Sequence, residues 1–270
     1  MSRKSSPATL ALSYIGLALL YIPLVFIAVF SVNANRHGQT WGGFTLGWYT
    51  KLFSNEQVQH AAVNSLILAI ASTIIATIFG TLLAIGIHRT PWGKKLNTFF
   101  DFSINIPVVT PDILMAIALV TVFGLFRTFL PCFEPGMLNL IISHVVFQIS
   151  FVVLIVLSRL SSIRPDQIEA ARDLYTTTTG AWFRVILPQL STGIIAGALL
   201  AFTLSLDDFI ISFFVSGPTS QTLPLYIYGS LKRGISPEIH ALSTLVIALT
   251  LGVMLVVLLY NQNHQRGKKK

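Results

Sequence analysis

Three aspartates lie inside stretches of the chain that otherwise carry almost no charge. Asp112 lies in the stretch 102–126, and the adjacent pair Asp207 and Asp208 lies in the stretch 190–214. A carboxylate at the centre of a lipid bilayer costs roughly 2.5–3.5 kcal/mol on insertion scales. Acidic residues in such positions usually face a polar pathway, where they bind a cation or carry a proton. These three residues are therefore the first candidates for chemistry.

Helical geometry separates the roles of the three carboxylates. Counting along their helices at about 1.5 Å per residue places Asp112 near the bilayer midplane and Asp207 toward the outer leaflet. Neighbouring helical residues point about 100° apart, so Asp207 and Asp208 do not both face one lumen squarely. We expect one to line the pathway and the other to pair with a neighbouring chain or a basic residue. The sequence equally allows both to cap backbone N–H groups at the outer end of their span.

Other side chains near the aspartates suit a cationic solute. Pro107 and Pro111 flank Asp112 and predict a local opening of the helix. Aromatic faces attract ammonium groups, and the nearby candidates are Phe209, Phe213, Tyr226 and Tyr228. Ordinary packing or a belt of aromatic residues at the membrane interface explains the same residues. His144, inside another apolar stretch, is either functional or hydrogen-bonded within the helical bundle.

The elements that carry these residues are long apolar stretches. Hydrophobic residues make up 53% of the 270 residues and charged residues 10%, against about 25% charged residues in a typical soluble domain. A transmembrane helix needs about 20 mostly apolar residues. Six stretches meet that length: 8–32, 62–87, 102–126, 137–157, 190–214 and 239–260. The sequence predicts an all-α, polytopic membrane helical bundle of six transmembrane helices, forming a single domain over residues 1–270.

The charged residues predict the orientation of these spans. Most of the 18 Lys and Arg residues fall in the N-terminal segment, the loops 88–101 and 158–189, and the C-terminal tail. Loops rich in Lys and Arg remain in the cytoplasm, so we expect both termini there. The first stretch is too long for the apolar region of a signal peptide and predicts an uncleaved span. The basic tail is interpreted as a topology anchor rather than a nucleic-acid site.

Signatures of several enzyme classes are missing from the sequence. There is no Walker A pattern, so we expect no ATP site and no other cofactor in this chain. No HExxH or Gly-x-Ser-x-Gly pattern occurs, and the single cysteine, Cys132, excludes an intrachain disulfide. The aspartates lie outside the sequence contexts of intramembrane aspartyl proteases. We therefore expect a protein that is not an enzyme.

The predicted cytoplasmic loop 159–189 has the pattern of a helix–turn–helix. Pro165 suits the first position of a helix, and Asp166 and Glu169 follow in the first turns, where the helix dipole favours negative charge. The polar run 176–179 predicts a break with a hydroxyl N-cap. A second short helix around Trp182 is expected to end before Pro188.

This loop resembles a known signature. Glu169-Ala170-Ala171, followed by Val185-x-Leu187-Pro188, is similar to the EAA motif of permease subunits in binding-protein-dependent ABC importers. The resemblance implies that Glu169, Ala170, Ala171, Leu187 and Pro188 belong to a coupling helix that docks into a cleft on an ATP-binding subunit. An amphipathic helix lying on lipid is the alternative. The family usually has glycine where this chain has Tyr175, and the tyrosine is expected to strain or reshape that turn.

The resemblance extends over nearly the whole chain, to the permeases of spermidine/putrescine importers. It is carried by these segments: 47–49, 64–66, 204–209, 216–218, 222–228 and 234–242. It implies a permease subunit in the bacterial inner membrane. The implied partners are a second permease, an ATPase dimer, a periplasmic solute-binding protein and a small cationic solute, with ATP held by the ATPase subunits. Residues 222–239 are the segment expected to face the binding protein.

The sequence leaves two alternatives open, one for the solute and one for the transport mechanism. The first keeps the importer and changes the solute to an amino acid, an iron chelate or an anion, although the acidic residues argue against an anion. The second is an ion-coupled secondary transporter in which Asp112 and the Asp207/Asp208 pair bind a proton or sodium.

Small residues recur at every fourth position of two stretches. Such stripes allow close helix packing in lipid, either against a second permease subunit or within this chain. They are Ser72, Ala76, Gly80 and Ala84, and Gly193, Gly197, Ala201 and Ser205.

Overall fold

The computed structural model describes residues 7–35, 40–174, 177–234 and 237–267. Across these ranges every extended element is a helix, apart from one isolated antiparallel bridge between Asn33 and Phe44. The predicted all-α class is confirmed. The chain forms two compact units, one made of residues 1–59 with 227–270 and the other of residues 60–226.

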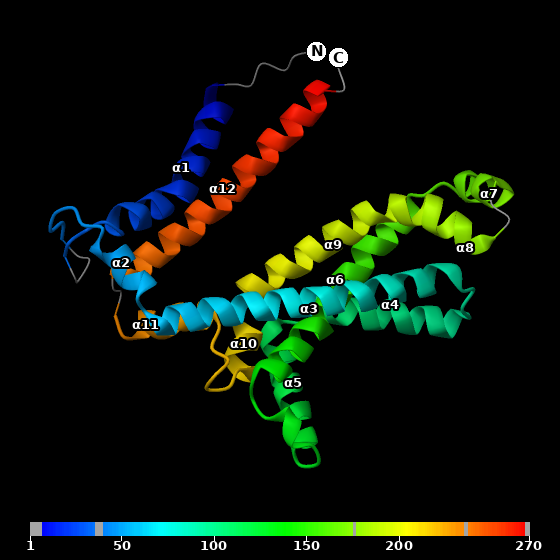
Figure 1. Ribbon diagram of the computed structural model, residues 1–270, viewed down its shortest axis with the longest axis horizontal. Coiled ribbons are helices and arrows are strands. Elements are labelled where there is room, and N and C mark those ends of the chain that lie inside the picture. The colour runs from blue at the N-terminus through cyan, green and yellow to red at the C-terminus, as the bar shows by residue number, and fades with distance from the viewer. Residues whose placement is uncertain (1–6, 36–39, 175–176, 235–236, 268–270) are drawn as a thin grey trace. The chain divides into compact units, whose positions relative to one another are not determined.

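The first unit contains the N-terminal and the C-terminal parts of the chain. Both α1 and α2 contact α12 (Figure 1). Asn55 donates a hydrogen bond through Nδ2 to Oε1 of Glu238 over 2.7 Å, which ties the segment after α2 to the start of α12. The helices that lie wholly or mostly in this unit are α1 (Pro7–Phe30), α2 (Gly47–Phe53), α11 (Leu223–Lys232) and α12 (Pro237–Gly267).

The second unit is built around α6, against which α4, α9 and α10 pack (Figure 1). Val152, Val153 and Val156 of α6 are fully buried and form its core with Leu190 of α9. The elements that lie wholly or mostly in this unit are α3 (Glu56–Arg89), α4 (Lys94–Val109), α5 (Asp112–Arg127), η1 (Pro131–Phe133), α6 (Met137–Ser161), α7 (Pro165–Leu174), α8 (Thr178–Ala181), the π-helix η2 (Trp182–Ile186), α9 (Leu187–Asp207) and α10 (Ile210–Val215).

Several helices are long and apolar enough to cross a membrane. Among the described residues these are α1, α3, α6 and the continuous helix Trp182–Asp207, and the bent pair α4–α5 would make a fifth span. In α12 the apolar part that qualifies is the shorter stretch Pro237–Gly252. A polytopic membrane protein is thus confirmed, while the count of six spans stays a prediction.

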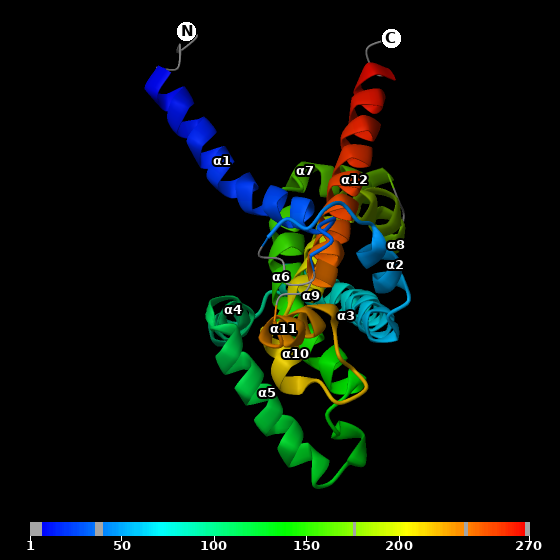
Figure 2. The same cartoon turned by 90° about the vertical axis from the view of Figure 1, so that its left-hand side faces the viewer.

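Two predicted spans are broken rather than continuous. The stretch 102–126 is divided between α4 and α5, which are bent by 111° (Figure 2). The ring of Pro111 disfavours helical geometry in the residue before it, and Thr110 is extended with a ψ of 130°. The stretch 190–214 is divided between α9 and α10, because Asp208 is extended with a ψ of 124°.

The loop 159–189 agrees with its prediction in its first half only. α7 begins at Pro165, and Thr177 accepts a hydrogen bond at Oγ1 from the Gly180 backbone N–H over 3.2 Å, as a hydroxyl N-cap does. The second helix was expected to end before Pro188. It instead continues through η2 into α9, because Pro188 falls in the first turn of α9, where a missing N–H is tolerated.

The small-residue stripes pack within this chain. The residues of both stripes are buried, and α6 lies against them. A Cβ atom added to Gly80 would lie 2.8 Å from Cγ1 of Val152, and one added to Gly193 would lie 2.7 Å from Cβ of Arg159. Of the two explanations that the sequence left open, close packing inside the bundle is the one observed.

Candidate functional site

The two helix breaks meet at one cavity of about 400 Å³ in the second unit. Its walls come from the end of α4, the start of α5, the middle of α6, the end of α9 and the start of α10. The lining residues are Pro107, Val108, Asp112, Phe147, Phe151, Leu204, Asp207, Asp208, Phe209, Ile210 and Ile211. All three aspartates predicted from the sequence therefore share this cavity.

The carboxylate of Asp208 is hydrogen-bonded to backbone N–H groups beside the break. Its Oδ1 accepts a hydrogen bond from the Ile211 N–H over 3.2 Å, and its Oδ2 accepts one from the Ser212 N–H over 2.8 Å. The side chain thus satisfies donors at the start of α10 that have no partner within the helix. The capping role that the sequence left open for the pair is the role of Asp208.

Asp207 and Asp112 are exposed on the cavity side of their breaks. Within the described ranges, no hydrogen bond or ion pair engages either carboxylate. Asp112 lies in the first turn of α5, where the helix dipole offsets part of the cost of its charge. These two side chains leave their oxygens available to a cation.

Aromatic side chains complete one wall of the cavity. Phe209 was predicted from the sequence, whereas Phe147 and Phe151 of α6 were not. Their spacing of four residues places them on one face of α6, but it is also the ordinary spacing of core residues, so the sequence offered no signal to distinguish them. Tyr226 is buried away from this cavity, and Tyr228 belongs to the other unit.

A buried polar cluster adjoins the cavity behind Asp208. His144 is fully buried, with Nδ1 2.8 Å from Oγ of Ser205 and Nε2 3.4 Å from Oδ2 of Asp208. Gln148, one turn further along α6, donates to Oγ of Ser72 over 3.2 Å and to the Ala201 carbonyl over 3.1 Å. The hydrogen-bonded interpretation of His144 is the one the structure supports.

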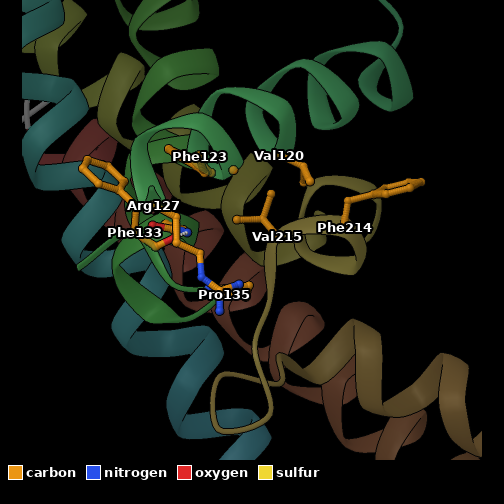
Figure 3. Close-up of a pocket in the computed structure, with 9 residues that line it drawn as sticks. Val120, Phe123, Arg127, Phe133, Pro135, Phe214 and Val215 are labelled. Carbon is orange, nitrogen blue, oxygen red and sulfur yellow. Dashed lines mark hydrogen bonds between the residues drawn. The ribbon is translucent and has the colours of Figure 1, made fainter. Parts of the chain in front are cut away.

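A smaller pocket lies at the other end of α5 and is mostly apolar. Figure 3 shows Val120, Phe123, Phe214 and Val215 around it, with Arg127 at its edge. Arg127 is paired with Glu134 over 3.3 Å. Because the cavity at the helix breaks presents carboxylates and this pocket presents an arginine, the former is the better site for a cation.

The predicted coupling residues lie on α7 and at the start of α9. Glu169 and Ala170 are exposed on α7, Pro188 is exposed and Leu187 is partly buried. The side chain of Ala171 and the whole of Tyr175 lie outside the described residues.

Comparison with known proteins places this architecture in a family. Residues 76–269 match the family described as "Binding-protein-dependent transport system inner membrane component". The chain belongs to this family of importer permeases.

Two relatives of this chain are named after the solutes of their transport systems. The chain is 37% identical over 250 residues to the spermidine/putrescine transport system permease protein PotC of Escherichia coli K12, covering 93% of this chain and 92% of that protein. It is 35% identical to the putrescine transport system permease protein PotI of the same organism, covering 90% of this chain and 86% of that protein.

Solved structures confirm the fold. A chain of a bacterial ABC transporter for the acidic polysaccharide alginate superposes with a TM-score of 0.73 at 20% identity, covering 97% of this chain and 95% of that chain. A chain of an alginate transporter solved with its pentasaccharide-bound periplasmic protein has a TM-score of 0.68 at 19% identity, covering 94% and 91%.

Proposed function

We propose that this chain is a permease subunit of an ATP-driven importer for polyamines such as spermidine and putrescine. The proposal is carried by the 37% identity, over nearly the full length, to a spermidine/putrescine permease. We place the chain in the bacterial inner membrane with both termini in the cytoplasm. The alternative solutes, an amino acid or an iron chelate, have no observation of similar strength in their favour.

The cavity chemistry supports a cationic solute. A polyamine is a flexible chain of ammonium groups, so it binds best where carboxylates are spaced and aromatic faces lie between them. Asp112 and Asp207 supply carboxylates from two different helices, and the three phenylalanines supply aromatic faces. A cavity bordered by broken helices also suits the transported group, because irregular backbone is tolerated in a membrane where it lines a cavity.

Transport would be driven from outside this chain. The proposed partners are a second permease, an ATPase dimer that binds ATP, and a periplasmic solute-binding protein. α7, with Glu169 and Ala170 exposed, would dock on the ATPase subunit and carry its closure to α9 through η2. The helices around the cavity would then alternate between inward-open and outward-open states.

Uptake of labelled putrescine and spermidine tests the proposal in cells that contain the complete importer. Deletion of this chain should abolish uptake, and the wild-type chain should restore it. Asp207→Asn should raise the concentration for half-maximal uptake about tenfold or more, the scale of a hydrogen bond to a charged group. Asp101→Asn, an exposed acid of α4 outside the cavity, is the matched control and should behave as wild type.

Either of two results would revise the proposal. Uptake of both polyamines that persists without this chain would remove the polyamine solute and leave family membership intact. Transport that continues without any ATPase subunit would instead favour an ion-coupled mechanism.

A further inference from the structure

The geometry points to His144 as a positioning residue that fixes the break between α9 and α10 through Asp208, so that Asp207 is the carboxylate presented to the solute. His144 does not line the cavity. It acts on the cavity indirectly, through Asp208. Only the part of this inference that concerns transport rests on the proposed function.

His144 contacts both sides of the break. Its Nδ1 lies 2.8 Å from Oγ of Ser205, which belongs to α9 before the break. Its Nε2 lies 3.4 Å from Oγ of Ser212, which belongs to α10 after the break. A single imidazole from α6 therefore connects α9 and α10 across the non-helical residues between them.

His144 also contacts Asp208, the residue at the break itself. The same Nε2 lies 3.4 Å from Oδ2 of Asp208. Because Nε2 faces a carboxylate, the tautomer with its hydrogen on Nε2 is the one that suits this contact with Asp208. Both Asp208 oxygens also accept backbone N–H groups of α10, and the carboxylate is 8% exposed. The Asp208 carboxylate is thus held by protein partners, even though the residue borders the cavity.

Asp207 takes its position from Asp208. It is the last residue of α9 and precedes the extended Asp208 directly. The direction of its side chain therefore depends on the backbone angles at the break, which the Asp208 contacts fix. No partner of its own holds the Asp207 carboxylate in the described part of the chain. Its placement in the cavity is consequently set by its neighbour, and through that neighbour by His144.

The ring of His144 is itself rigidly placed. It is fully buried, and the ring of Phe147 packs edge-on against it with centroids 5.4 Å apart. Such a buried polar residue stabilises one arrangement only when its polar atoms are satisfied. A substitution that keeps a hydrogen-bond donor at the position of Nε2, facing Asp208, should preserve the break. A substitution that removes only this donor should not.

Two amide substitutions separate these cases. In His144→Gln the terminal amide reaches the position of Nε2, and in His144→Asn it reaches only the position of Nδ1. We expect His144→Gln to keep near-wild-type polyamine uptake. We expect His144→Asn to raise the concentration for half-maximal uptake about tenfold, with the maximal rate per assembled transporter little changed. A histidine with a merely structural role would lower the amount of assembled transporter and leave that concentration unchanged.

A second measurement tests the positioning without any transported solute. In the assembled transporter with Cys132→Ser, the rate at which a positively charged thiol reagent modifies Asp207→Cys reports the placement of residue 207. His144→Asn should change this rate severalfold, whereas His144→Gln should not. Asp112→Cys, across the cavity on α5, is the matched control, and its rate should stay the same in both backgrounds.

The two measurements have distinguishable failures. Equal modification rates at residue 207 in wild-type, His144→Asn and His144→Gln backgrounds would overturn the positioning role. A changed rate in a transporter that imports no polyamine would support the positioning role and overturn the proposed function alone.

Discussion

Asp207 and Asp208 are adjacent in the sequence and have opposite environments. Asp208 accepts hydrogen bonds from two backbone N–H groups of α10, and His144 contacts its Oδ2. Asp207 is exposed on the cavity and ends α9. The pair therefore divides two tasks that one carboxylate rarely performs together, because a carboxylate committed to capping a helix is not free to bind a mobile cation.

This division predicts different effects on stability. Asp208→Ala should lower the stability of the purified protein by about 0.5–2 kcal/mol, the range for losing a helix N-cap. Asp207→Ala should leave the stability nearly unchanged, since no described contact of its carboxylate is lost. Thermal unfolding of both variants in detergent checks this. An equal loss of thermal stability in the two variants would contradict the division.

Close packing at Gly80 predicts that this position of α3 does not tolerate a larger side chain. In Gly80→Ala the added methyl group would lie 2.8 Å from Cγ1 of Val152, and overpacking of this kind typically costs about 1–3 kcal/mol. Gly86→Ala, in the same helix with nothing within 4 Å, should instead be neutral or stabilising. The melting temperatures of the two variants provide the measurement.

A compensating substitution makes the cause of the Gly80 effect testable. Val152→Ala creates space opposite Gly80, so the double variant should recover part of the stability lost in Gly80→Ala. If the double variant is less stable than the sum of the two single changes, the contact between α3 and α6 is not the origin of the effect.

Local signals explain which parts of the fold the sequence predicts. Pro165 marks the start of α7 and Pro111 marks the break before α5, because a proline ring acts on its own residue and the one before it. The stripe of small residues likewise predicts close packing. Its partner, α6, could not be predicted, since the stripe carries no information about the helix that fills it.

The break at Asp208 shows why other features were missed. Neither proline nor glycine lies between Leu204 and Ile210, so the stretch was predicted as one continuous span. The break is stabilised by capping and by His144, which is distant in the sequence. The same holds for Phe147 and Phe151, whose role follows from where α6 lies and not from their spacing.

The exposed face of α7 predicts a specific requirement for coupling. Glu169→Lys should abolish co-purification of the ATPase subunit with the permease, because it reverses the charge at the centre of the proposed docking surface. Gln167→Lys places a lysine at another exposed position of α7 and should retain the ATPase subunit. Retention of the subunit by both variants would show that α7 docks through other residues.

The bend at Pro111 predicts that the shape of the cavity depends on a single ring. Pro111→Ala removes the restriction on Thr110, which is extended with a ψ of 130°, and allows α4 and α5 to join as one helix. Straightening would carry Asp112 away from Asp207 and lower uptake. Spin labels at Lys95→Cys and Leu125→Cys, in a Cys132→Ser background, should therefore move apart in Pro111→Ala. Pro107→Ala, a substitution within α4 that leaves the bend in place, is the control and should keep the label separation of the parent. An unchanged label separation in Pro111→Ala would mean that tertiary packing rather than the proline holds the bend.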